Sequence, residues 1–174
     1  QNLLSLALSK KGDLVASNSS GDLLKANLNN GNVSWSINTL GSMLAHDTDF
    51  FKSSDIVIKD EFIFFSTRTS IFSINLKNGF TNWEKNINSI SAPIVDNENV
   101  FIVSENGFFV ILDQQKGRII SSTNILKILK KKKQLTKETG FIMGSGKIYA
   151  VTLNGYLIVS SATTGKVEKF VKIG

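Results

Sequence analysis

The sequence predicts an all-β fold, a β-propeller made of four-stranded antiparallel blades. A segment of 22 residues recurs four times, as residues 14–35, 62–83, 100–121 and 148–169. Each copy holds two short runs of β-forming residues and then a turn that ends in glycine. These glycines are Gly31, Gly79, Gly117 and Gly165, at intervals of 48, 38 and 48 residues. A period of about 40 residues built from strands is typical of propeller blades.

The turn between the two runs is polar. It is centred on Gly21, Gly107 or Gly155 in three copies, and the second copy has Thr69 there and must turn without glycine. A five-residue loop follows the second run, at residues 27–31, 75–79, 113–117 and 161–165. Its first residue is Asn, Asp or Ser, whose side chain can bond the backbone two residues on. Its last residue is Gly, which adopts the left-handed conformation without steric cost, so we expect a hairpin turn.

Two copies carry a tryptophan four residues after the loop glycine, Trp35 and Trp83. A side chain of this size is expected to pack one sheet on the next. The third and fourth copies have Ser121 and Lys169 instead. The sequence therefore predicts weaker packing by tryptophan in the later blades.

A further apolar segment precedes each copy and supplies the innermost strand, at residues 1–11, 55–59, 92–95 and 141–143. Pro93 suits the start of a strand, where its missing N–H costs nothing. Four units of four strands follow, with blades at about 1–39, 40–88, 89–125 and 126–174. We expect residues 1–174 to form a single partial propeller domain, about half of an eight-bladed ring, with open blade faces at its ends.

The composition limits the class of protein. With 174 residues and 41% hydrophobic residues, the chain can bury the core of one domain. It has no apolar run of 18 residues and no cysteine, which excludes a membrane-spanning helix, disulfides and thiolate metal sites. The chain begins at Gln1 rather than Met, so we expect it to be a piece of a longer protein.

The net charge of +6 is unevenly distributed, because six lysines crowd into residues 127–137, including the run Lys130–Lys133. Nucleic-acid binding would need lysines along a groove with stacking aromatics between them. Here the lysines occupy one insertion and the phenylalanines lie inside strands, so no nucleic-acid partner is expected. A solvated loop, or a contact with an acidic partner or anionic lipid headgroups, remains open.

The sequence offers no set of residues for catalysis. His46 is the only histidine, so no nucleophile and base can be assembled. Residues 143–147 (MGSGK) resemble a phosphate loop, but Phe141 stands where that motif needs glycine and Ile148 follows the lysine. We predict a turn between strands there, and no catalytic, cofactor-binding or metal-binding residue in the chain.

Residues 46–49 (HDTD) form the densest polar cluster outside the repeats. No glycine or downstream glutamate completes a calcium loop around them. A solvated loop with local Asx turns, a protein-binding patch and a metal site are the alternatives. Asp47 and Asp49 are the acidic pair that we assign as the candidate partner-binding residues.

The repeat pattern then points to a family. The pattern Lys25-x-Asn27-x-x-Asn30-Gly31-x-x-x-Trp35 resembles the repeat of pyrroloquinoline-quinone (PQQ)-type propellers, Ala-x-Asp-x-x-Thr-Gly-x-x-x-Trp. The second copy is similar, and the third and fourth keep part of the pattern; the matching residues are Ser73, Asn75, Asn78, Gly79, Trp83, Asp113, Gly117, Thr164 and Gly165. Two classes share this repeat: quinoprotein dehydrogenases, which hold quinone and calcium at the ring centre, and non-enzymatic BamB-type lipoproteins of the outer-membrane β-barrel assembly machinery.

The chain looks more like the BamB type, because it lacks vicinal cysteines and any Glu/Asn/Asp set that would make a calcium and base site. That resemblance implies a scaffold without enzyme activity or cofactor, in the periplasm of a Gram-negative bacterium at the inner face of the outer membrane. It implies a lipid anchor outside this chain, and a contact of Asp47 and Asp49 with the barrel-assembly protein BamA. A fragment of a quinoprotein dehydrogenase and a generic propeller interaction module are the alternatives.

Overall fold

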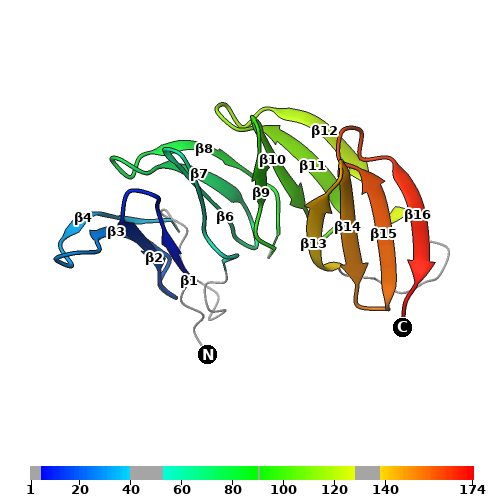
Figure 1. Cartoon of the computed structure of the whole chain (residues 1–174), viewed down its shortest axis with the longest axis horizontal. Coiled ribbons are helices and arrows are strands. Elements are labelled where there is room, and N and C mark those ends of the chain that lie inside the picture. Colours follow the sequence, from blue (N-terminus) through cyan, green and yellow to red (C-terminus); the bar gives the residue numbers. More distant parts are fainter. Residues whose placement is uncertain (1–4, 40–52, 90, 128–137) are drawn as a thin grey trace. The chain divides into compact units, whose positions relative to one another are not determined.

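The computed structural model describes residues 5–39, 53–89, 91–127 and 138–174. In these ranges sixteen strands form four antiparallel sheets of four strands, so the predicted all-β fold with four-stranded blades is confirmed (Figure 1). Each sheet is a meander whose strands follow chain order. The chain divides into two compact units, residues 1–92 and 93–174, each holding two of the sheets.

The first unit holds the sheets β1–β4 and β5–β8. Their strands are β1 (Ser5–Leu8), β2 (Asp13–Ser17), β3 (Asp22–Asn27), β4 (Val33–Asn38), β5 (Val57–Lys59), β6 (Phe62–Ser66), β7 (Ile71–Asn75) and β8 (Thr81–Lys85). The two sheets bury a common core made of Val15, Leu23, Ile56, Ile63, Phe65, Phe72, Ile74 and Leu76. Because side chains alternate along a strand, Val15 and Leu23 face this core while Leu14 and Leu24 face away from it.

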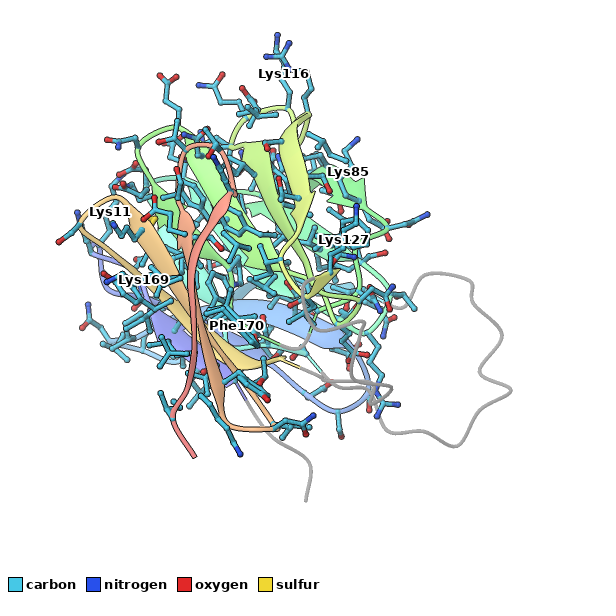
Figure 2. The ribbon with its side chains drawn as sticks, turned by 90° about the vertical axis from the view of Figure 1, so that its right-hand side faces the viewer. Lys11, Lys85, Lys116, Lys127, Lys169 and Phe170 are labelled. Atoms are coloured by element: carbon cyan, nitrogen blue, oxygen red, sulfur yellow. The ribbon has the colours of Figure 1, made fainter. Side chains whose placement is uncertain are left out.

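The second unit repeats this arrangement with the sheets β9–β12 and β13–β16. Their strands are β9 (Ile94–Asp96), β10 (Asn99–Val103), β11 (Phe108–Asp113), β12 (Ile119–Asn124), β13 (Glu138–Gly144), β14 (Lys147–Thr152), β15 (Tyr156–Ser161) and β16 (Val167–Lys172). The buried core is Phe101, Val103, Phe109, Ile111, Ile125, Ile148, Ala150, Ile158 and Ala162. Phe170 packs against this core and stacks on Tyr156, whereas its neighbour Lys169 is exposed (Figure 2).

The five-residue loops form as the sequence predicts. In every copy the N–H of the loop glycine donates to the carbonyl of the first loop residue, at 2.8–2.9 Å. The side chain of that first residue accepts the N–H two residues on, as Asn27 Oδ1 does from Asn29 at 2.9 Å and Asp113 Oδ1 from Gln115 at 3.1 Å. All four loop glycines have positive φ, from 62° to 77°. Each loop therefore needs glycine for its backbone conformation.

The second copy turns without glycine, and its turn is one residue shorter: Ser66 pairs with Ile71, whereas in the first copy Ser17 pairs with Leu23. Thr67 Oγ1 accepts the N–H of Ser70 at 3.0 Å, and the Thr67 N–H donates to the Ser70 carbonyl at 2.7 Å. In the other copies the turn glycine donates its N–H to the carbonyl three residues before it. The equivalent side chains of the other copies, Asn18, Ser104 and Thr152, also accept a backbone N–H, from the residue four positions on. The second copy therefore differs by its shorter turn, in which no residue has positive φ.

The predicted inner strands are β1, β5, β9 and β13, and each lies at the edge of its sheet. Pro93 directly precedes β9, which agrees with its predicted place at a strand start. Ser145 and Gly146 form the turn between β13 and β14, with φ of 51° and 70°. The MGSGK segment is therefore a hairpin turn, as expected.

Candidate functional site

The predicted partner-binding residues lie outside the described residues. This holds for Asp47 and Asp49, for His46, and for the lysine run at 130–133. Described residues do define both ends of the connection that carries the acidic pair. Thr39, after β4, donates its N–H to the Gly21 carbonyl at 2.8 Å, and Ile56, before β5, donates its N–H to Ser5 Oγ at 2.9 Å. The connection therefore leaves and rejoins the first unit at fixed points.

A polar cluster braces the end of β4 where this connection begins. The Asp22 carboxylate accepts from Asn18 Nδ2 at 2.9 Å and from Asn38 Nδ2 at 2.8 Å. These two hydrogen bonds, of which the one from Asn18 has the larger effect, lower the pKa of Asp22 below its ordinary value of 3.8.

In the second unit Lys147 Nζ lies 2.6 Å from Glu168 Oε2, and this bond raises the pKa of Lys147.

The first unit contains a pocket of about 570 Å³. It lies at the ends of the first unit's strands that are opposite to Asp22 and to the end of β4. Its walls are the β1–β2 turn, β3, the β5–β6 turn and the loop between β7 and β8. We call it the turn pocket. Eight of its lining residues are charged: Lys10, Lys11, Asp13, Lys25, Lys59, Asp60, Glu61 and Lys77. The four others are Leu8, Ser9, Ile58 and Leu76.

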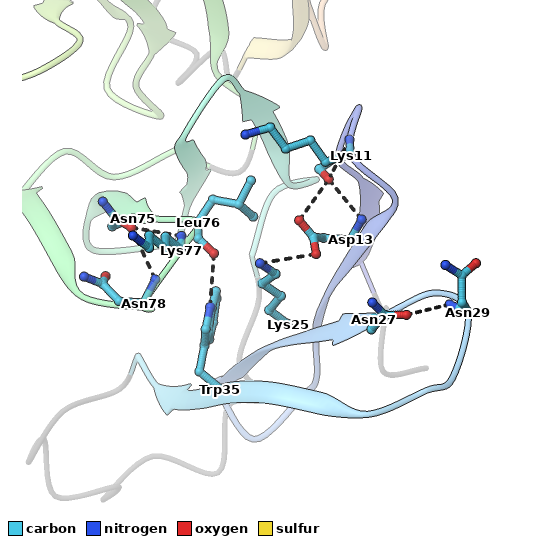
Figure 3. Close-up of polar contacts among 11 residues, drawn as sticks. Lys11, Asp13, Lys25, Asn27, Asn29, Trp35, Asn75, Leu76, Lys77 and Asn78 are labelled. Carbon is cyan, nitrogen blue, oxygen red and sulfur yellow. Dashed lines mark hydrogen bonds and ion pairs between the residues drawn. The ribbon is translucent and has the colours of Figure 1, made fainter.

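Leu76 forms the buried part of the turn pocket, and two hydrogen bonds hold it. Its N–H donates to the Glu61 carbonyl at 2.8 Å, and its carbonyl accepts from Trp35 Nε1 at 3.1 Å. The Trp35 ring also lies against Gly79, where an added Cβ would come within 2.9 Å of the ring. Trp35 therefore joins the two sheets, as the sequence predicts, and fixes one wall of the pocket (Figure 3).

An ion pair lies inside the turn pocket. Lys25 Nζ is 3.2 Å from Asp13 Oδ1, and the two side chains are only 14% and 20% exposed. The Ser9 hydroxyl donates to Asp13 Oδ2 at 3.3 Å and accepts the Asp13 N–H at 3.0 Å. Asp13 thus compensates Lys25. The other four lysines of the pocket have no ion pair with any residue that the structure describes.

The chemistry available to these residues is recognition by charge and apolar contact. Within the described ranges, no three His, Cys, Asp or Glu side chains gather in a way that could hold a metal ion. No helix in those ranges has the length and apolar character needed to cross a membrane.

Comparison with known families connects this architecture to a named group. The family model described as outer membrane protein assembly factor BamB matches residues 2–123. The match covers well over half of the chain. The chain belongs to this BamB family of PQQ-like repeat propellers. Among curated proteins, a sequence search finds no match.

Solved structures similar to this BamB-family chain show the same fold. BamB from Moraxella catarrhalis superposes with a TM-score of 0.74 at 18% identity, over 95% of this chain and 51% of its own. The Cps50 (Swd1) β-propeller domain of Myceliophteria thermophila gives 0.72 at 11% identity, over 98% and 55%. The quinohemoprotein alcohol dehydrogenase ADHIIG from Pseudomonas putida HK5 gives 0.57 at 14%, over 66% and 19%. The chain spans about half of the first two.

The turn pocket is the feature that sequence reasoning missed. Its lysines come from four segments spread between residues 10 and 77, and no local motif marks them. The only available signal was the repeat itself, since Lys11, Lys59 and Lys77 lie in or beside turns that the repeat already defines. These lysines line one pocket only because of the way in which two consecutive sheets pack.

Proposed function

We propose that this chain acts as a non-enzymatic, protein-binding scaffold in the assembly of outer-membrane β-barrel proteins. The observation that carries the proposal is the BamB family match over residues 2–123. The matched range includes the connection with Asp47 and Asp49, so the candidate partner loop belongs to the family-like part of the chain. The proposed location is the periplasmic face of the outer membrane, with a lipid anchor supplied by sequence outside this chain.

The proposed partner is BamA, bound through Asp47 and Asp49. Two carboxylates two residues apart in one connection present concentrated negative charge to a basic partner surface. The hydrogen bonds of Thr39 and Ile56 support this assignment, because they hold both ends of the connection on a rigid sheet pair. Reversing both charges would replace attraction by repulsion at the interface.

Capture of BamA by the full-length protein tests this proposal. We expect Asp47→Arg/Asp49→Arg to retain less than a tenth of wild-type capture, because charge reversal at a close ion pair removes attraction and adds repulsion. The matched control is Asp96→Arg/Glu98→Arg, which makes the same charge change at two exposed residues, at the end of β9 and in the β9–β10 turn, and should stay within twofold of wild type. Equal capture by both variants would remove Asp47 and Asp49 from the site.

The competing function is a quinoprotein dehydrogenase, since those enzymes use the same repeat. The likeness to ADHIIG is a likeness of fold alone. Among the residues that the structure describes, no three His, Cys, Asp or Glu side chains gather to hold a metal ion. Titration of the full-length protein with PQQ and calcium separates the two functions. Saturable quinone binding that depends on calcium would favour the dehydrogenase.

A further inference from the structure

We propose that the turn pocket is a second binding site, which takes an acidic peptide segment that carries an apolar side chain. The proposal concerns the pocket between β1–β2, β3, β5–β6 and β7–β8, and it does not depend on a role in barrel assembly. Asp47 and Asp49 belong to the connection that leaves β4 at the other end of the strands. The two sites can therefore be varied separately.

The charge of the pocket selects for an acidic occupant. Its lining contains five lysines and three acidic residues, a net charge of +2. Lys25 and Asp13 neutralise each other, which leaves four lysines against Asp60 and Glu61. Lys10, Lys11 and Lys77 are exposed, so their ammonium groups are accessible to a ligand from solution. A ligand with two or more carboxylates would restore the local charge balance.

The apolar residues of the pocket call for more than a bare anion. Leu8 lies on the edge strand β1 and is 61% exposed, and half-buried Ile58 lies on the edge strand β5. Both line the same pocket as buried Leu76. An apolar side chain placed between them would remove this surface from water, which a free inorganic anion cannot do.

The pocket is largely pre-formed. The carbonyl of Gly12 accepts the N–H of Leu28 at 3.3 Å, so the β1–β2 turn is tied to the loop after β3. The Glu61 carbonyl holds the Leu76 N–H, and Trp35 holds the Leu76 carbonyl. A ligand would therefore not need to order these walls, and binding would cost less conformational entropy. A volume of about 570 Å³ lies within the usual range of roughly 300–1,000 Å³ for ligand pockets.

The kind of cation favours carboxylates along a segment over a single phosphate. Lysine ammonium groups are compact point charges on flexible stems, whereas planar bidentate recognition of phosphate relies on arginine forks. The lining contains no arginine. Four flexible lysines on three segments, the β1–β2 turn, the end of β5 and the β7–β8 loop, can instead follow carboxylates spaced along an extended peptide. In Figure 3, Lys11 and Leu76 extend toward the same space from the two sheets.

Isothermal titration calorimetry of the full chain with a capped Asp-Leu-Asp-Leu-Asp peptide tests the proposal. We expect saturable binding that weakens as salt is raised, because the lysines are exposed to screening ions. A capped Ser-Leu-Ser-Leu-Ser peptide should bind at least tenfold more weakly. Equal binding of the two peptides, or no binding of the acidic one, would overturn the proposal.

Charge-reversed variants locate the site. Lys11→Glu/Lys59→Glu/Lys77→Glu should weaken binding of the acidic peptide at least tenfold. The control Lys116→Glu/Lys169→Glu/Lys172→Glu changes the net charge equally at exposed residues of the second unit and should stay within twofold of wild type. Figure 2 shows Lys116 and Lys169. Equal loss in both variants would show attraction to net charge alone and would overturn the site.

Two further variants distinguish loss of the binding site from misfolding of the protein, and distinguish this site from the proposed BamA-binding site. Lys11→Ala/Lys59→Ala/Lys77→Ala introduces no repulsion and should still lose most of the affinity, with an unchanged circular dichroism spectrum. Asp47→Arg/Asp49→Arg should bind the peptide as well as wild type. Loss of peptide binding in the Asp47→Arg/Asp49→Arg variant would contradict a separate site. Loss of BamA capture with unchanged peptide binding would support two separate sites.

Discussion

Trp35 in the first unit and Thr123 in the second each lie against the loop glycine of the following sheet. A Cβ added to Gly79 would come within 2.9 Å of the Trp35 ring, and one added to Gly165 within 2.8 Å of Thr123 Oγ1. Trp35 donates to the Leu76 carbonyl at 3.1 Å, and Thr123 donates to the Thr164 carbonyl at 3.3 Å. Both contacts need a residue without a Cβ, and both glycines also have positive φ. A large ring makes the contact in the first unit, and a short hydroxyl side chain makes it in the second.

The second unit has a buried apolar side chain at a later position of the copy. Four residues after the loop glycine it has Ser121 where the first unit has Trp35. Eight residues after the glycine it has Ile125, which is fully buried in the core, where the first unit has the polar Thr39. Both Ile125 and Thr39 donate their N–H to the carbonyl of the preceding turn glycine. The backbone hydrogen bond at this position is thus the same in both units, and the apolar anchor lies four residues later in the second unit than in the first.

The largest effect should come from Ile125→Ala. Removing a fully buried branched side chain loses its transfer free energy and leaves a cavity, so we expect a loss of about 3 kcal/mol in the free energy of unfolding. Urea denaturation followed by circular dichroism measures it. Thr39→Ala at the matching position should cost less than about 1 kcal/mol, because Thr39 is only half-buried. Equal losses would show that the anchor has not moved.

Trp35→Ala should have the next largest effect. Trp35 is half-buried and carries one hydrogen bond, so we expect a loss of about 2 kcal/mol. Trp35→Phe keeps most of the ring contact and should lose only about 1 kcal/mol, the net value of the bond to Leu76. Fluorescence of Trp83, which lies in the same unit, follows unfolding of both variants in urea. A loss below about 0.5 kcal/mol for the alanine variant would contradict the role of Trp35 as an anchor.

A pair of glycine variants isolates the ring contact itself. Gly31 and Gly79 have similar positive φ, 70° and 77°, but a Cβ at Gly31 would meet nothing within 4 Å. Gly31→Ala should therefore cost only the backbone strain, about 1 kcal/mol. Gly79→Ala should cost about 1 kcal/mol more, because the Trp35 ring must shift. The two variants should become equal in a Trp35→Ala background, and a difference that persists there would assign the extra cost to another contact.

Much of the fold could be predicted because its signals are local. Residues 27–31 carry a complete turn signal, and the strand runs on both sides of it are rich in β-formers. The turn of the second copy was less predictable, since it is one residue shorter than the glycine-containing turns and holds no residue with positive φ. The domain boundaries and the number of blades in the whole ring stay predictions. So does the assignment of Asp47 and Asp49, which lie outside the described residues.

The sequence by itself determined the repeat, the four-stranded sheets, the glycine loops and the membership of a propeller family. These follow from residues within one copy, where each side chain acts on the backbone a few positions away. Apart from the Trp35 contact, which the repeat pattern predicts, only the tertiary structure decided which side chains of one sheet meet the next. The burial of Ile125 in a core shared by two sheets and the gathering of the lysines around Leu76 both depend on such packing. The physical reason is that packing between sheets joins residues tens of positions apart, and no local pattern encodes which surfaces will come together.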